Sequence, residues 1–271
     1  MSLLAWQGAL VELIGGGESA LSGRGLSPTE AAWFRSVADA PGTRMTRAVA
    51  ASWRVERVSR STPLTLLALA ALGLRSSMLS AYCRQTRPRS SYLVTEGLAF
   101  LDFMNDRQTR DPHLRAMTAL DRAILRARIT NWRGPDPTGH IDVPVTANDW
   151  IQSTAGGAVV EVHADPRALL LALVSQSPLP EPGDVTGAFV VGPGIEGRFR
   201  EASAAEARVY AAAAVGASVA DVVQATEDRP VLDRLVQAGV LSRTARPPVD
   251  PKPHHHLVAP TGRRWFDEEA Q

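Results

Sequence analysis

Apolar residues recur at helical spacing through the first half of the chain, and no strand-like alternation of apolar and polar residues occurs before residue 140. Several segments in this half carry the signals of a helix start. The strongest is Ser27-Pro28-Thr29-Glu30, a capping box with proline at the first helical position. Thr62-Pro63 and Asp111-Pro112 start two further helices. These signals predict an all-helical domain over residues 1–135.

The composition changes in the turn-rich segment Gly134-Pro135-Asp136-Pro137-Thr138-Gly139, which we take as the domain boundary. Beyond it, β-branched residues predict a strand over 158–163, and a hairpin is predicted around Gly192-Pro193-Gly194. Three short helices and a terminal strand over 240–244 follow, the order of a winged-helix-like module. We therefore expect an α+β fold. It comprises the helical domain, a winged-helix-like domain over 136–246, and a Pro-rich extended tail over 247–271.

The composition excludes several classes of protein. Cys83 is the only cysteine, so the chain has no internal disulfide and no cysteine-based zinc site, which fits a reducing compartment. The longest apolar run, from Leu66 to Leu74, is far shorter than the ~20 residues that span a bilayer. No basic residue precedes Arg24, unlike a secretory signal. We expect a cytoplasmic protein without a membrane partner.

The net charge of +1 conceals an asymmetry, because residues 1–140 carry +7 and residues 141–271 carry −6. A basic half can attract nucleic acid. The arginines are spread over several predicted helices, however. In the helix at the recognition position, Asp228 and Asp233 offset the positive charges of Arg229 and Arg234. We expect no nucleic-acid partner, and a winged-helix DNA-binding regulator stays as the alternative.

No known catalytic motif occurs, neither Gly-x-Ser-x-Gly nor His-Glu-x-x-His nor a dinucleotide fingerprint. The three adjacent histidines 254–256, that is His254, His255 and His256, lie in the Pro-rich tail and lack the spacing of convergent metal ligands. Cys83 is followed by arginines that can activate a thiol, but a buried cysteine is the default interpretation. A stand-alone thiol enzyme is thus a distant third hypothesis. We expect no catalytic residue and no metal site, and only a minor structural pairing of Glu96 and Asp102 with arginines.

A small sheet with an open edge can accept an extended peptide as an added strand. The second strand of the predicted hairpin would lie opposite the third short helix of this domain. Together they would suit an acidic or apolar peptide segment. The candidate peptide-binding residues are Arg198, Phe199, Arg200, Leu232, Leu235 and Val236.

Two stretches of the helical half resemble a known family. Arg87-Pro88-Arg89-Ser90-Ser91-Tyr92-Leu93, with Glu96-Gly97 and Phe100-Leu101-Asp102-Phe103 after it, resembles the PPRSPYL…YGEGFPEFL stretch of the HvfC/BufC family's helical domain. Residues 111–123 resemble the LPYLADLARLEWA stretch that follows there. The hairpin, Ser203–Glu206 and residues 232–241 look like a PqqD-type RiPP recognition element. The combination is similar to the partner-subunit family of MbnC, in methanobactin biosynthesis, and TglI, in 3-thiaglutamate biosynthesis.

The resemblance implies a non-catalytic subunit that holds no cofactor of its own. Such a subunit forms a heterodimer with a TIM-barrel oxidative enzyme of the MbnB/TglH type, which supplies the iron. It binds the leader of a ribosomal precursor peptide as an added strand, here expected along Ile195–Glu201, and presents the peptide's cysteine to that enzyme. A 3-thiaglutamate-like pathway is favoured over a methanobactin-like one.

Overall fold

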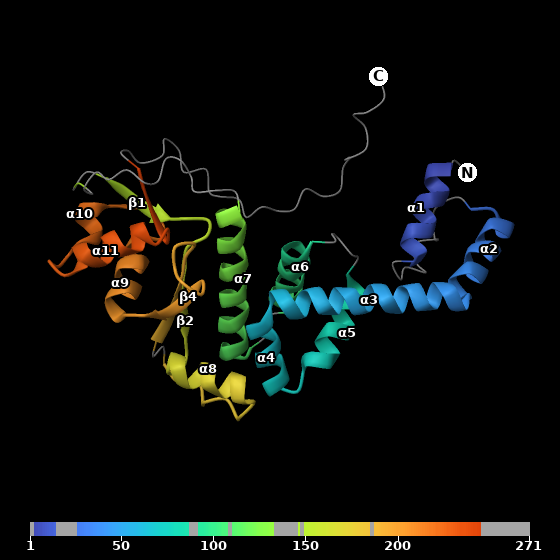
Figure 1. Ribbon diagram of the computed structural model, residues 1–271, viewed down its shortest axis with the longest axis horizontal. Helices are drawn as coiled ribbons and strands as arrows, with labels where there is room; N and C mark the ends of the chain where they lie inside the picture. The colour runs from blue at the N-terminus through green and yellow to red at the C-terminus, as the bar shows by residue number, and fades with distance from the viewer. Residues whose placement is uncertain are drawn as a thin grey trace, which may run out of the picture.

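The computed structural model describes residues 3–14, 26–86, 92–107, 110–132, 146, 149–184 and 187–244. It confirms the α+β class: helices dominate the N-terminal half, and two small antiparallel sheets lie in the C-terminal half. Figure 1 shows helix α7 (Pro112–Trp132) standing between the preceding helices of the chain and the two sheets. In the ranges described, no helix combines the length and the apolar character needed to cross a bilayer.

The helical half contains α1 to α7, and its predicted starts are confirmed. Ser27 accepts a hydrogen bond from Glu30 N while the Glu30 side chain accepts from Ser27 N, so the capping box is formed. The helix predicted after Thr62 ends before Gly73, which is left-handed (φ 70°), and a second helix follows from Arg75, so Gly73 ends the first helix rather than weakening one long one. The bounds are α1 Leu3–Ile14, α2 Pro28–Asp39, α3 Pro41–Ser61, α4 Pro63–Ala71, α5 Arg75–Gln85, α6 Leu93–Asp106 and α7 Pro112–Trp132.

The C-terminal half forms two three-stranded sheets with the orders β5-β1-β6 and β2-β3-β4. The predicted strand at 158–163, the hairpin and the final strand are confirmed, whereas β1 and the two-residue β5 were not predicted. The last hairpin strand begins at Phe199, because residues 195–198 form a turn in which Arg198 is left-handed (φ 79°). The bounds are β1 Trp150–Ser153, β2 Ala158–Val162, α8 Pro166–Ser175, β3 Gly187–Val191, β4 Phe199–Ala202, α9 Ala204–Ala213, β5 Ala217–Ser218, α10 Val219–Val222, α11 Asp228–Gln237 and β6 Leu241–Thr244.

Helix α9, strand β5, helices α10 and α11, and strand β6 follow one another in winged-helix order. The third strand of that module, β1, comes from earlier in the chain and lies between β5 and β6. A buried apolar cluster holds this module together. Its largest members are Ile151, Val190, Val209, Val219, Val222, Val231, Leu232, Leu235, Val240 and Leu241.

The β2-β3-β4 sheet is covered on both faces. One face packs on α7, and the other contributes Val190 to the winged-helix cluster. The main hydrophobic core therefore contains helical residues such as Leu120 and Met117 together with sheet residues such as Val162 and Phe189. The predicted division at residue 135 falls outside the described residues, and the core continues across it.

A buried ionic cluster fixes the end of α3 against α5 and α6. Arg54 Nε donates to Glu96 Oε1 at 2.7 Å, and the Tyr82 hydroxyl donates to the same oxygen at 2.7 Å. Arg54 also donates to the carbonyl and hydroxyl oxygens of Thr86. The side chains of Arg54 and Glu96 are only 4% and 0% exposed. The expectation of a minor pairing at helical spacing was wrong for Glu96, since this is a desolvated ion pair. Asp102 does pair with an arginine at the surface, but with Arg122 of α7 (2.6 Å) rather than at helical spacing on its own helix.

Candidate functional site

The outer edge of strand β2 carries main-chain groups that no strand of the described structure pairs. Hydrogen bonds alternate in direction along an antiparallel ladder. The bond from Gly192 N to Arg198 O shows which residues of β3 face which neighbour. Even-numbered residues of β3 form hydrogen bonds with β4, and odd-numbered ones form them with β2. The N–H and C=O groups of Val159 and Glu161 therefore point away from β3.

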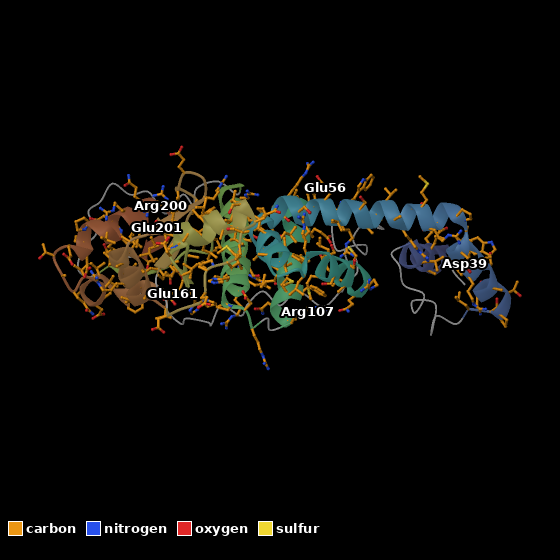
Figure 2. All side chains as sticks on the ribbon, turned by 90° about the horizontal axis from the view of Figure 1, so that it is seen from below. Asp39, Glu56, Arg107, Glu161, Arg200 and Glu201 are labelled. Atoms are coloured by element: carbon orange, nitrogen blue, oxygen red, sulfur yellow. The ribbon has the colours of Figure 1, made fainter. Side chains whose placement is uncertain are left out.

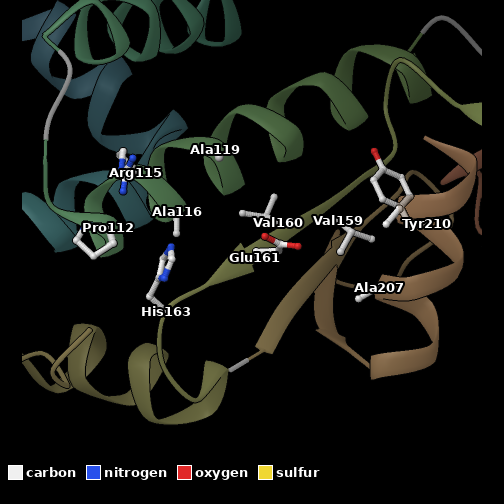
Figure 3. Close-up of a pocket in the computed structure, with 11 residues that line it drawn as sticks. Pro112, Arg115, Ala116, Ala119, Val159, Val160, Glu161, His163, Ala207 and Tyr210 are labelled. Atoms are coloured by element: carbon white, nitrogen blue, oxygen red, sulfur yellow. The ribbon is translucent and has the colours of Figure 1, made fainter. Parts of the chain in front are cut away.

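This edge lies at the base of a groove of about 490 Å³ between α7 and α9. Figure 3 shows the labelled α7 residues on one side of β2, and Ala207 and Tyr210 of α9 on the other. Small side chains make the room on both walls. The lining residues are Pro112, Arg115, Ala116, Ala119, Val159, Val160, Glu161, His163, Ala207, Tyr210 and Ala211.

Local sequence signals position the two walls. Asp111 Oδ1 accepts from Leu114 N at 2.8 Å and caps α7, whose first turn lines the groove. At the start of α9, Ser203 and Glu206 form the predicted capping box. Arg200 anchors it with two hydrogen bonds to Glu206, at 2.6 and 2.9 Å. These bonds hold the pKa of Glu206 down at about 2.

The open stretch of the edge has defined ends. At one end, the Tyr210 side chain lies beside Val159 and Ser153, and burial raises the pKa of Tyr210. At the other end, Gly183 N donates to His163 O at 2.9 Å, and a ring nitrogen of His163 lies 3.2 Å from Gly183 O. The outward-pointing main-chain groups of Val159 and Glu161 lie between these ends. They fit a short extended segment of another chain.

The charged side chain of Arg115 lies at one end of the groove. Figure 3 shows Arg115 and His163 toward the same end, while Glu161 lies nearer the middle. Arg115 is exposed and forms no ion pair with any residue that the structure describes. An acidic side chain of a bound segment would find a partner there, and small apolar side chains would fit between the alanines.

The structure places the sequence-predicted peptide residues on a different edge and in the core. Phe199 is half-buried, with its ring edge-to-face on Phe189 at 5.6 Å. Leu232 and Leu235 are 0% and 1% exposed, so neither offers surface to a peptide, and Val236 is partly buried against the same cluster. The predicted residues are thus divided between strand β4 with the turn before it and the inward face of α11.

Strand β4 also has an outer edge, formed by the main-chain groups of Phe199 and Glu201. The Glu201 carbonyl accepts from Arg200 Nη1 at 2.9 Å, so this edge is partly capped by its own side chain. Arg200 is therefore engaged twice, with Glu206 and with this carbonyl. Arg198 is partly buried, and its Nη1 has no partner among the described atoms.

The remaining sequence-predicted groups show no activating environment. Burial raises the pKa of the Cys83 thiol, which disfavours the thiolate that a nucleophile needs. Within the described ranges, no group of three or more His, Cys, Asp or Glu could hold a metal ion. His254, His255 and His256 lie outside those ranges.

Sequence reasoning missed the groove, although it predicted the strand that forms its base. The order of strands in a sheet depends on contacts between distant segments, and nothing in residues 158–163 reveals which edge stays open. The alanines spaced along α7 and α9 were the available signal. Comparison with known proteins gives no family: no protein-family model matches the chain, and no curated protein is significantly similar to it.

Proposed function

We propose that this chain is a non-catalytic, cytoplasmic subunit that binds an extended peptide segment by strand addition and presents it to a partner enzyme. The observation that carries the proposal is the open edge of β2 at the base of a groove with a helix on each side. An added strand buries alternate side chains against the two flanking helices while its backbone pairs with the edge.

We expect the peptide to bind weakly to this edge alone and more tightly when the partner enzyme also contacts it. Each main-chain hydrogen bond to the β2 edge contributes about 0.5–1.5 kcal/mol, and the few bonds that this short edge offers are too little for a stable complex by themselves. Contacts with the alanine walls and with Arg115 add to it, and a partner that binds the same peptide adds more. The proposed partner is an iron-dependent TIM-barrel oxidative enzyme that modifies a cysteine of a ribosomal precursor peptide, in a 3-thiaglutamate-like pathway. We expect the two proteins to bury more than ~1,000 Å² together.

Proline substitutions test the strand addition directly. Glu161→Pro removes an edge N–H that points away from the sheet, a position where proline is tolerated. Glu161→Ala keeps that N–H and is the matched control, and Glu201→Pro makes the same change on the β4 edge. Peptides are selected from a phage-displayed library on the wild-type protein, and their affinities are measured by fluorescence anisotropy. We expect Glu161→Pro alone to weaken binding, by about two- to tenfold, because it removes one such hydrogen bond. Equal binding by both proline variants and the wild type would contradict the proposed site.

Co-purification tests the partner. The chain is co-expressed with an oxidative barrel enzyme and a short cysteine-containing peptide encoded beside it, and peptide modification is followed by mass spectrometry. We expect modification only when all three are present. Oxidation of the peptide by the isolated chain would overturn the adaptor proposal.

A DNA-binding regulator is the alternative outcome. Arg229 lies 3.5 Å from Asp233 on α11, which reduces the positive charge that a recognition helix would offer. Titration with duplex DNA at two salt concentrations checks it, because phosphate contacts give a steep salt dependence. Tight, salt-sensitive DNA binding together with no peptide selection would favour the regulator.

A further inference from the structure

The groove beside β2 offers two opposite charges to an added strand. Arg115 of α7 lies at the end of the groove that His163 marks, and Glu161 of β2 lies nearer its middle. Both side chains are exposed, and neither forms an ion pair with a residue that the structure describes. A bound segment therefore meets one positive and one negative group at fixed positions. Their consequence for the peptide rests on the proposed function.

Helix α7 runs antiparallel to β2 along this groove. Its C-terminal part lies beside the start of the strand, since a β-carbon on Gly156 would stand 3.2 Å from the α-carbon of Ala127. Its first turn lies at the other end, where Arg115 lines the groove together with His163. The helix rises about 1.5 Å per residue and the strand about 3.3 Å, so about two helix residues correspond to each strand residue. Arg115 is therefore level with Val162.

Side chains of a strand added to β2 would alternate between the two walls of the groove. Val160 and Val162 pack into the core beneath α7, whereas Val159 packs against the winged-helix cluster. Residues of an added strand that lie opposite Val160 and Val162 therefore face α7. Those opposite Val159 and Glu161 face α9. Arg115 and Glu161 thus act on neighbouring positions of the bound segment.

We propose that the β2 edge selects a segment with an acidic residue opposite Val162 and a residue that is not acidic opposite Glu161. The first position faces α7 at the level of Arg115, whose guanidinium can pair with a carboxylate there. The second position lies beside the Glu161 side chain, and like charges directly opposite each other on a sheet repel. The peptide class is an extended segment with an acid at one end and neutral side chains along the remainder.

No other charged side chain lines the part of the groove that the structure describes. Among its lining residues, Arg115 and Glu161 alone carry a full charge at neutral pH. Arg200 and Glu201 belong to β4, at the opposite edge of the same sheet. Figure 2 shows them on the upper side of this part of the molecule and Glu161 on the lower side. An ionised side chain elsewhere on the segment would lose water without gaining a partner, so the alanine walls favour neutral side chains.

Peptide selection tests the charge pattern. A random phage-displayed library of short peptides is selected on the wild-type protein and on Glu161→Ala, and both pools are sequenced. In the wild-type pool we expect Asp and Glu to be enriched at one position and depleted at the next. In the Glu161→Ala pool we expect the enrichment to remain and the depletion to vanish. A wild-type pool without an acidic position would overturn the proposal.

Charge reversal tests the role of Arg115. Arg115→Glu and Arg126→Glu make the same change of charge on α7, but Arg126 is exposed and does not line the groove. By fluorescence anisotropy, a selected peptide should bind about three- to tenfold more weakly to Arg115→Glu and less than about twofold more weakly to Arg126→Glu. A peptide with lysine in place of its acidic residue should recover binding to Arg115→Glu, which also shows that this variant is folded. Equal losses in the two variants would refute the proposal.

Failure of the charge pattern and failure of the proposed function give different results. If selected peptides bind Glu161→Pro as tightly as the wild type, the β2 edge is not the site, and the charge pattern falls with it. If Glu161→Pro weakens them while Arg115→Glu and Arg126→Glu behave alike, strand addition stands and the charge pattern alone is refuted.

Discussion

Removal of the Arg54 guanidinium should destabilise the protein more than any surface substitution. In Arg54→Met, the Glu96 carboxylate, which is fully buried, would keep only the Tyr82 hydroxyl as a partner. Loss of one member of a buried ion pair costs about 3–5 kcal/mol, because the other charge stays desolvated and unpaired. Methionine fills most of the volume of the arginine stem, so a cavity adds little. We therefore expect the free energy of unfolding to fall by about 3–5 kcal/mol.

Urea denaturation measures this loss. For a chain of this size the slope is about 3 kcal/mol per molar urea, so the midpoint should fall by at least ~1 M. The double variant Arg54→Met/Glu96→Leu removes both charges and should recover most of the loss. Glu96→Gln is the milder control, since its amide oxygen still accepts from Arg54. A midpoint shift below ~0.3 M in Arg54→Met, or a double variant no more stable than the single one, would refute the reasoning.

The remaining predictions concern pH and close packing. Burial raises the pKa of Asp121 to about 6, so the folded state loses stability as pH rises from about 4 to 7. Between those two pH values the wild type should therefore lose up to about 3 kcal/mol of unfolding free energy relative to Asp121→Asn, as measured by urea denaturation at about pH 4 and pH 7. Arg200→Ala should lower the free energy of unfolding by about 0.5–1 kcal/mol at pH 7. Because Arg200 lowers the pKa of Glu206, the difference in thermal stability between this variant and the wild type should disappear as pH falls from about 4.5 to 2. Gly157→Ala would set its β-carbon against the backbone oxygen of Val240, closer than van der Waals contact allows. We expect a loss of more than about 2 kcal/mol in the free energy of unfolding by the same denaturation assay, and an unchanged midpoint would contradict it.

Local signals in the sequence predicted most of the helices and their caps. Ser27 and Ser203 each precede a glutamate by three residues, and both capping boxes are formed. Such features depend on neighbours in the chain, so a short window is sufficient to identify them. The hairpin around Gly192 is of the same kind, although its second strand starts later than expected because Arg198 turns the chain.

Non-local features could not be predicted in this way. Strand β1 pairs with strands that lie more than 60 residues away in the sequence, and its own residues have no clear alternation. Glu96 is a charged residue, and only the arrival of Arg54 and Tyr82 from two other helices makes its burial tolerable. The candidate groove depends on the same kind of information, since α7 and α9 come from opposite halves of the chain.

The core that passes from α7 into β2 and β3 has a consequence for how the chain can be divided. A fragment ending near residue 135 would leave the apolar side of α7 bare, and the complementary fragment would expose Val162 and Phe189 to water. Neither piece would be a self-sufficient folding unit, and both would tend to aggregate. Thermal unfolding should therefore be a single cooperative transition that includes both halves. A chimera that exchanges one half between homologous chains would fold only if the residues on the shared face were exchanged with it.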